Sequence, residues 1–359
     1  MQRLRILIDA STLTLYPPIS SPFHGATEML LKRLARLLAT RHDVHVLSIE
    51  KEQVYEGVTW WPTARGPRVA DLLISFANVA TRSPFTVDRH IVFQTSPHVT
   101  LHEGWEKATF VAISDVQSRL TRQVRPQLKD GQLLVIKPGV DVPKPQEQRI
   151  PNRLIYCSSP DRGLIHLCHI WPRLKQAVPD ISLRVTYQPE EWIKMNRWRH
   201  DLWAEQALEL EHWFETDASV IPGRARRELG ESPIFEMEKA ALHAMPMDPL
   251  NIGDGAHMLA GMEAAAAGCA LLYSTCEGLP EIFGEAADFL ALPINADAWV
   301  EQIVDILTDR GRQWKMQERA KTWAKTQPWS LWKHQWLKLV EDGRLPTRPL
   351  ARVESVAVR

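Results

Sequence analysis

The residues best suited to chemistry lie in an apolar segment, Met258–Gly284, whose first half holds a single acid, Glu263. A carboxylate inside an apolar helix costs free energy unless it is paired or hydrogen-bonded. The segment continues through the small-residue corner Ala267-Gly268 and an apolar strand into a glycine loop, Gly278-Leu279, that leads into a new helix. A carboxylate at such a corner, followed by a helix N-terminus, could hold a ribose and an anion. The alternative is a glutamate at an exposed helix edge.

Arg162 is the second candidate, because it lies in a turn directly before a predicted helix. A cation at a helix start opposes the helix dipole, so its presence there favours a role in neutralising an anion. An ordinary surface arginine is the alternative. Ser158 and Ser159 in the same turn could donate hydrogen bonds to that anion, or they are simple loop serines.

Gly25 and Asp254 lie in two further loops that lead into predicted helices. Gly25 would let the backbone approach a phosphate closely while helix N–H groups point at it, or it only makes a turn. Asp254, next to Gly255, would either contact a ligand or cap the following helix as an Asx-turn residue.

The elements that must position these residues are short buried strands alternating with amphipathic helices, a pattern typical of doubly wound parallel sheets. Strands are predicted over residues 4–9, 44–48, 72–75, 91–93, 110–113, 133–136, 154–156, 183–187, 244–246 and 269–273. Helices are predicted over residues 29–40, 115–124, 163–175, 190–211, 233–242, 299–307, 313–326 and 329–340. Ser114 is the expected N-cap of the 115–124 helix.

A proline-rich stretch, Pro138–Pro151, indicates a linker that divides the chain. We therefore expect an α/β protein with two Rossmann-like domains, residues 1–142 and 143–328, and a loose tail over residues 343–359. Ligands of such sheets bind outside the carboxyl ends of the strands. Two facing sheets would thus enclose an interdomain cleft.

Charge is balanced over the whole chain but slightly uneven along it. Residues 1–150 carry 19 Lys and Arg against 14 Asp and Glu, a net charge of +5, and the remainder carries −5. This asymmetry suits an N-terminal half that meets anionic material but is too small to indicate nucleic acid. The four cysteines lack metal-ligand spacing, which favours reduced thiols in a cytosolic protein. No stretch of the sequence reaches the ~18–20 uncharged apolar residues that a membrane-spanning helix needs.

Five segments together resemble the retaining glycosyltransferases of the GT-B fold, glycosyltransferase family 4, also described as glycosyl transferases group 1. The most specific is Met262–Ile282, which is similar to the family pattern LEAMAxGxPVVxSxxGGxPEI. The others follow the family's order and are Gly25–Glu28, Ile136–Asp141, Ser159–Gly163 and Trp329–Trp336. The resemblance covers most of the chain and implies that the last helix, about residues 329–342, packs back on the first domain.

The resemblance also implies roles for individual residues. Glu263 would accept hydrogen bonds from the ribose hydroxyls of a nucleotide, and Arg162 would neutralise its diphosphate. His98 resembles a position whose histidine contacts the donor sugar, with a polar loop residue as the alternative, and Asp254 would touch the same sugar. The remaining donor-site residues would be Gly25, Ser158, Ser159, Gly255, Gly278 and Leu279.

The chain departs from the family pattern at two positions. Cys157 stands where the family usually has arginine, and Ser158 or Ser159 could donate hydrogen bonds in its place. The family's acidic pair is separated by seven residues, so the partner of Glu263 should fall at position 255. That residue is Gly255, and the nearest acid, Asp254, is one place off.

The resemblance thus implies a metal-independent, retaining enzyme of bacterial cell-surface polysaccharide synthesis, and the cysteine pattern favours a cytoplasmic location. It would transfer a hexose from a nucleotide-diphosphate sugar to a saccharide or lipid-linked acceptor. No Asp-x-Asp motif occurs in the chain, so no metal cofactor is expected. The alternatives are a GT-B sugar-nucleotide epimerase or phosphorylase, and a non-catalytic partner subunit of the same fold.

Two groups of residues keep more than one interpretation. A set of basic helix residues could contact anionic lipid on the inner face of a membrane, or form solvated helix faces. These are Lys32, Arg33, Arg36, Arg119, Arg122, Arg125 and Lys129. The tryptophans at positions 192, 198, 203 and 213 could stack on sugars, or pack a helix against the core.

Overall fold

A computed structural model of the chain describes residues 3–11, 26–48, 51–76, 79–80, 84–95, 100–101, 106–144, 147–186, 189–199, 201–223, 234–247, 258–276 and 278–343. Four predicted site residues, Gly25, His98, Asp254 and Gly255, lie outside these residues. The predicted tail lies outside them as well, from residue 344 onward.

The N-terminal lobe is built on a mainly parallel sheet with the strand order β10-β9-β7-β5-β1-β2-β4-β3. Its strands are β1 (Arg5–Asp9), β2 (Asp43–Ser48), β3 (Gln53–Tyr55), β4 (Val58–Pro62), β5 (Val69–Phe76), β7 (Thr86–Phe93), β9 (Thr109–Ala112) and β10 (Leu133–Val135). The helices of this lobe are α1 (Ala26–Ala39) and α2 (Asp115–Val124), and a separate parallel pair is formed by β6 (Val79–Ala80) and β8 (Thr100–Leu101).

One edge of this sheet departs from the expected parallel pattern. Strands β3 and β4 form an antiparallel hairpin that the sequence analysis did not predict. The two turn residues, Glu56 and Gly57, have φ angles of 51° and 78°. These values fit a two-residue type I′ turn, which requires positive φ at both of its central residues, and only the glycine gives a signal for it in the sequence.

The C-terminal lobe is built on a second sheet with the order β13-β12-β11-β14-β15-β16, in which the described strands are parallel. The strands are β11 (Arg153–Tyr156), β12 (Ser182–Val185), β13 (Val220–Ile221), β14 (Leu242–Met245), β15 (Ala270–Ser274) and β16 (Asp288–Leu290). Every residue of β14 and β15 is buried, as expected for parallel strands covered on both faces.

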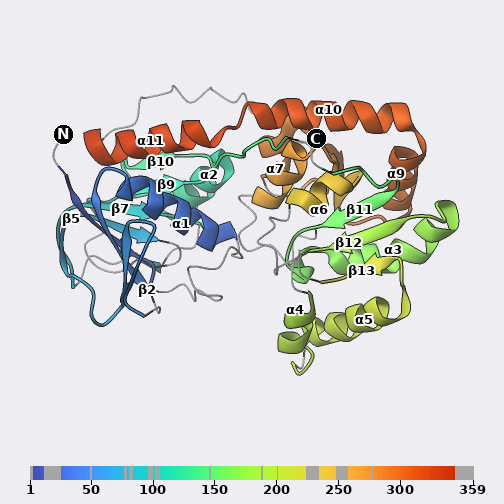
Figure 1. Cartoon of the computed structure of the whole chain (residues 1–359), viewed down its shortest axis with the longest axis horizontal. Coiled ribbons are helices and arrows are strands. Elements are labelled where there is room, and N and C mark those ends of the chain that lie inside the picture. Colours follow the sequence, from blue (N-terminus) through green and yellow to red (C-terminus); the bar gives the residue numbers. More distant parts are fainter. Residues whose placement is uncertain are drawn as a thin grey trace.

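Helices cover both faces of the second sheet. They are η1 (Pro160–Arg162), α3 (Leu164–Ala177), α4 (Pro189–Asn196), α5 (Leu202–Thr216), α6 (Ile234–Lys239), α7 (Leu259–Ala266), α8 (Leu279–Phe283), η4 (Gly284–Ala286), α9 (Ala296–Thr308) and α10 (Arg310–Lys325). Figure 1 shows α6, α7 and α10 on one side of the sheet and α3 and α5 on the other. None of the helices in the described part of the chain is long and apolar enough to cross a membrane.

The helix predicted over residues 115–124 was confirmed together with its cap. The α2 helix spans the predicted residues, and the side chain of Ser114 accepts a hydrogen bond from the backbone N–H of Gln117. The single helix expected over residues 190–211 was wrong, because two helices, α4 and α5, occupy this region. Asp201 starts the second helix by accepting a hydrogen bond from the backbone N–H of Trp203, which is the usual role of an N-cap aspartate.

The tryptophans of this region mostly pack. Trp192 contacts Trp203 edge to face, and Trp213 contacts Trp171 in the same way. Trp198 is different, because 77% of its surface is exposed. The helix expected over residues 233–242 also needs correction, because α6 ends at residue 239 and Leu242 already belongs to β14.

The final helix, α11 (Trp329–Asp342), returns to the N-terminal lobe. Trp336 contacts Phe93 of β7 edge to face, with 4.8 Å between ring centroids. Arg89, also on β7, donates hydrogen bonds to the carbonyl oxygens of Leu339 and Val340 (2.9 and 2.6 Å). These carbonyls belong to the last turn of the helix, where a cation is favourable.

The chain thus crosses between the lobes twice, and the two crossing segments lie against each other. The backbone N–H of Val140 donates a hydrogen bond to the carbonyl oxygen of Gln327 (2.7 Å), and Val140 also forms a bridge with Pro328. We call residues 138–141 and 326–329 the paired crossover. Apart from that bridge, the described residues of the predicted linker carry no helix or strand.

Candidate active site

Glu263 lies on α7, the buried helix that leads into the corner before β15. Gly268 at this corner has a φ of +80°, a left-handed conformation that glycine adopts most readily. The helix, tight corner and buried strand expected from the sequence are therefore confirmed. Their effect is to place one acid at the edge of an otherwise apolar layer.

The environment of Glu263 is unfavourable for a charge. Burial raises the pKa of its carboxyl group to about 7, and the positive charge of Arg33 on α1 lowers that pKa in part. The residue is partly buried, and the protein around it disfavours the charged form of its carboxyl group. Perturbed acids of this kind are concentrated at binding and catalytic sites, and the carboxylate form would accept hydrogen bonds from ligand hydroxyls with little competition from water.

Arg162 ends the single turn of η1, which lies between β11 and α3. The turn is fixed on one side because the Tyr156 hydroxyl donates a hydrogen bond to the carbonyl oxygen of Ser159 (2.8 Å). It is fixed on the other side by Gly163, whose φ is +96° and whose added Cβ would lie 2.0 Å from the carbonyl oxygen of Pro246. The turn that carries Ser158, Ser159 and Arg162 is therefore packed tightly against the end of β14.

Cys157, where the resembled family carries arginine, lies in the same neighbourhood as Glu263. Its thiol makes a hydrogen bond with Thr186, and burial raises the pKa of the thiol well above its usual range. A thiol in this state is neutral and unreactive at physiological pH. Arg184 on β12 does not replace the missing charge, because Glu236 and two backbone carbonyl oxygens already engage its guanidinium.

Gly278 and Leu279 are held by contacts that the sequence did not suggest. A Cβ added at Gly278 would lie 2.9 Å from a methyl group of Val116 on α2. The backbone N–H of Leu279 donates a hydrogen bond to the carbonyl oxygen of Cys276 (3.1 Å). The close approach at Gly278 thus serves the neighbouring lobe, and the role of both residues in holding an anion stays a prediction.

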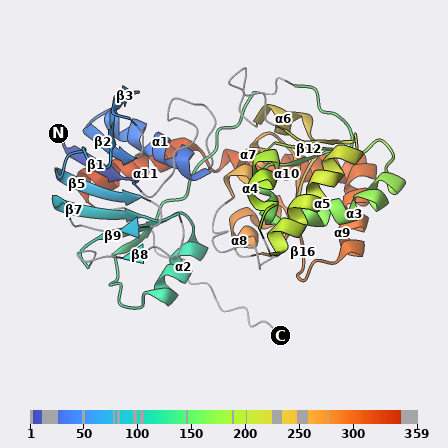
Figure 2. The ribbon, with the colours of Figure 1, turned by 90° about the horizontal axis from the view of Figure 1, so that it is seen from below.

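The N-terminal lobe reaches this segment at both ends. At one end, Arg119 on α2 forms an ion pair with Glu281 on α8, and Figure 2 shows these helices on the sides of the two lobes that face each other. At the other end, Arg33 on α1 acts on Glu263. Sequence reasoning missed both interactions, because no local pattern joins residues so far apart in the chain. The only available signal was the basic character of the two helices.

Comparisons with known proteins identify solved structures of similar architecture. No family profile and no curated protein sequence matches the chain. Among solved structures, "WaaG, a glycosyltransferase involved in lipopolysaccharide biosynthesis" is similar, with a TM-score of 0.65 at 15% identity over 94% of this chain and 99% of that chain. The sucrose-phosphate synthase of Thermosynechococcus elongatus gives a TM-score of 0.67 at 13% identity over 95% and 99% of the two chains. HepE of Anabaena, in complex with UDP-glucose, gives 0.66 at 12% identity over 95% and 100%.

The chain has the GT-B fold. Identities this low show the fold alone, so the activity must be argued from the site. In this GT-B chain, Glu263, Cys157 and the Arg162 turn lie on elements of the second sheet that meet near the carboxyl ends of its strands. That is the edge at which parallel sheets bind ligands.

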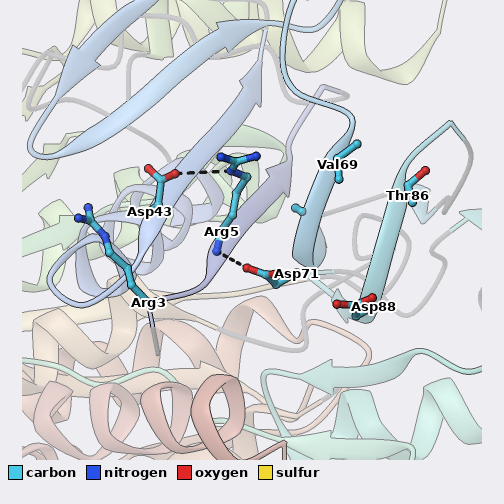
Figure 3. A pocket seen from close by; sticks show the side chains of 8 residues that line it. Arg3, Arg5, Asp43, Val69, Asp71, Thr86 and Asp88 are labelled. Atoms are coloured by element: carbon cyan, nitrogen blue, oxygen red, sulfur yellow. Dashed lines mark hydrogen bonds and ion pairs between the residues drawn. The ribbon is translucent and has the colours of Figure 1, made fainter. Parts of the chain in front are cut away.

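A surface hollow of ≈ 660 Å³ lies in the first lobe, at the edge of its sheet where the strands begin (Figure 3). It is bounded by the amino ends of β1, β2, β5 and β7. Charged groups within it already interact, because the backbone N–H of Arg5 donates to Asp71 (2.6 Å) and the Arg5 guanidinium lies 3.7 Å from Asp43. Because the hollow lies at the amino ends of the first sheet, and not at the carboxyl ends of the second, it is not part of the candidate site.

The basic helix faces are largely engaged within the GT-B chain itself. Lys32 lies over the ring of Tyr55, and Arg36 pairs with Glu56 at 3.1 Å. Arg122 is 3.5 Å from Asp130. These contacts leave less positive charge for an anionic lipid than the sequence alone suggests, and membrane contact stays a prediction.

Proposed function

We propose that this protein is a retaining, metal-independent glycosyltransferase. It transfers a hexose from a nucleotide-diphosphate sugar to a saccharide or glycolipid acceptor in bacterial cell-surface polysaccharide synthesis. The observation that carries the proposal is Glu263, a desolvated acid at the ligand-binding edge of the second sheet of a GT-B chain. Two of the similar structures support it, since one is a glycosyltransferase of lipopolysaccharide biosynthesis and another holds UDP-glucose.

The proposed division of labour follows the geometry of the second lobe. Residues 143–328 bind the nucleotide sugar, with Glu263 accepting hydrogen bonds from the ribose hydroxyls. Arg162, on a turn fixed by Tyr156 and Gly163, neutralises charge that develops on the departing diphosphate. The serine hydroxyls of the same turn donate further hydrogen bonds to the diphosphate. They take the place of the family's arginine, for which Cys157 is no substitute.

The first lobe, residues 1–142 with the returning α11, holds the acceptor in this proposal. Gly25 and His98 would approach the donor from that side, and Asp254 and Gly255 would contact the sugar from the other. The acceptor hydroxyl attacks the anomeric carbon on the face from which the diphosphate leaves, and its proton passes to the leaving phosphate oxygen. The configuration is therefore retained without the close carboxylate pair that a retaining glycosidase requires.

Donor binding and slow donor hydrolysis test this function. The purified protein would be screened against UDP-, GDP- and ADP-sugars by thermal shift and by release of the free nucleotide. We expect Glu263→Gln to weaken donor binding about tenfold, because a hydrogen bond to a charged acceptor is lost. We expect Arg162→Met to slow donor cleavage about a hundredfold, since a preorganised cation is lost.

Matched controls come from neighbouring elements of the same lobe. Glu285→Gln removes an exposed acid of η4, directly after the segment that holds Glu263, and Arg173→Met removes a half-exposed arginine of α3 that pairs with Asp297; both should leave binding and cleavage unchanged. A protein that binds none of these donors would not be a glycosyltransferase. That result would favour a non-catalytic partner subunit, the alternative supported by the neutral thiol of Cys157 at the position of the family's arginine.

A further inference from the structure

A row of largely buried aromatic side chains lies against α7, the helix that carries Glu263. Its members come from four elements and are His243 of β14, Tyr273 of β15, Phe283 of α8 and Trp323 of α10. Successive rings are in contact, with 5.5, 5.2 and 4.9 Å between their centroids. We call these four residues the aromatic row. It connects the second sheet to α8 and α10.

Gly261 is the residue at which α7 contacts the aromatic row. A Cβ added there would lie 2.7 Å from Cζ of Phe283, 3.0 Å from the Tyr273 hydroxyl oxygen and 2.9 Å from the sulfur of Met258. Glycine inside a helix is destabilising relative to alanine. The close approach of the ring tip and the hydroxyl gives the physical reason for a glycine at this position.

The groups that face Gly261 have little freedom to move aside. The Tyr273 hydroxyl lies 2.9 Å from Nδ1 of His243, and burial lowers the pKa of this imidazole to about 3, so it is neutral at physiological pH. The Phe283 ring contacts the rings of both Tyr273 and Trp323. Because a closely packed interior has no room for an added methyl group, α7 itself would have to shift.

The same contact fixes the relation between two parts of the candidate site. Phe283 is the last residue of α8, the helix that begins directly after Gly278. Gly261 precedes Glu263 by two residues, which is about 200° around a helix, so Glu263 projects from the opposite side of α7. A shift of α7 away from the row would therefore carry Glu263 with it. Figure 2 shows α7 and α8 on the side of the second lobe that faces the first.

We propose that Gly261, Tyr273 and Phe283 are positioning residues of the nucleotide site: the contact between α7 and the aromatic row holds Glu263 and the Gly278 backbone at one fixed separation, so that a single nucleotide diphosphate reaches both. The inference rests on the proposed function, in which Glu263 binds the ribose, and on the predicted role of Gly278 in holding the anion. Binding groups must stay within about 0.5 Å of their productive geometry, so a shift of α7 against α8 weakens binding.

Nucleotide affinity is the first test. Binding of UDP, GDP and ADP would be measured by calorimetry. We expect Gly261→Ala to weaken binding of the preferred nucleotide about tenfold, because α7 must move away from Phe283. Adding Phe283→Leu, which removes the ring tip, should restore the affinity to within about threefold of wild type. A wild-type Kd in Gly261→Ala would overturn the proposal, and so would a double variant that binds no better than Gly261→Ala.

Gly66→Ala is the matched control, because a Cβ there would press on Leu47 and Trp61 in the first lobe. It should lower the melting temperature and leave the nucleotide Kd unchanged. A merely structural role of Gly261 would give that same result in Gly261→Ala. If Gly261→Ala does not fold, as judged by circular dichroism, Tyr273→Phe replaces it, since it removes only the hydroxyl that α7 contacts. We then expect about threefold weaker binding, and an unchanged Kd would overturn the proposal.

Hydrogen exchange tests the contact between α7 and α8 without any ligand. The backbone amides of residues 279–283 would be followed by mass spectrometry in the free protein. We expect them to exchange about fivefold faster in Gly261→Ala, because α8 loses its packing against α7, and at the wild-type rate in Gly66→Ala. Equal rates in wild type and Gly261→Ala would show that Gly261 does not hold the two helices together, and would refute the inference.

The two measurements separate this inference from the proposed function. Wild-type protein that binds none of the three nucleotides would overturn the proposed function and, with it, the effect on nucleotide affinity. Hydrogen exchange would still decide whether the aromatic row holds α7 and α8 together. Conversely, normal nucleotide binding by both the wild-type protein and Gly261→Ala would leave the proposed function intact and refute the positioning role.

Discussion

Among the described residues, two contacts between the lobes differ in kind. One is the paired crossover, where backbone lies against backbone at Gly139 and Trp329. The other is the contact between α2 and α8, where side chains meet: Val116 lies against Gly278, and Arg119 pairs with Glu281. Both contacts use a glycine for space rather than for a left-handed backbone.

The crossover contact has little freedom to change. Its atoms are backbone atoms joined by the hydrogen bond between Val140 and Gln327, and an added Cβ would meet two successive residues of the facing segment. The α2–α8 contact is more adaptable. Its ion pair is 58% and 31% exposed on its two sides, and exposed pairs contribute about 0–1 kcal/mol.

Under the proposed function, this difference indicates how two such lobes would close around a donor. The paired crossover has the properties of a pivot, since its contacts need not break during closure. The α2–α8 contact has the properties of a separable latch, and it touches the loop that carries Gly278. Domain closure in such enzymes completes the site and excludes water.

The largest effect is expected from a Cβ at the crossover. Gly139→Ala should lower the free energy of unfolding by about 3 kcal/mol, because backbone on both sides must move. Urea unfolding followed by circular dichroism measures it. Gly311→Ala on α10 is the control, since its Cβ would meet only a side-chain oxygen of Asp309 at 3.3 Å, and we expect no loss there. Equal stability of the two variants would show that the crossover is adaptable after all.

A smaller effect is expected at the latch glycine. Gly278→Ala should cost about 1 kcal/mol, because the facing group is a side chain that can shift. Val116→Ala combined with Gly278→Ala should recover part of that loss, and a double-mutant cycle in urea would measure the coupling. Strict additivity of the two changes would mean that the two residues do not press on each other.

The smallest effect is expected from the ion pair itself. Arg119→Ala should lower stability by no more than about 0.5 kcal/mol, and the effect should fade at high salt. The exchange Arg119→Glu with Glu281→Arg should restore the wild-type value, whereas Arg119→Glu alone should open the lobes in small-angle X-ray scattering. A large loss of stability in Arg119→Ala would place this contact on a par with the crossover.

Local signals in the sequence predicted many elements well. The helix over residues 115–124 was predicted with its cap, because Ser114 acts on a backbone N–H three residues away. The corner at Gly268 was predicted because an apolar helix and an apolar strand flank a residue that tolerates positive φ. The break between α4 and α5 was missed, since helical residues continue through it and only Asp201 marks the new start.

The candidate site also has features that the sequence predicts and features that only the tertiary structure shows. The sequence by itself determined that an acid, Glu263, lies in an apolar helix before a tight corner, because hydrophobic pattern and glycine freedom are properties of neighbouring residues. Only the tertiary structure decided that this acid is desolvated, that Cys157 lies near it, and that Arg33 opposes its burial from the other lobe. Electrostatic effects depend on distance through space and on the exclusion of water, and neither quantity is written in the order of residues along a chain.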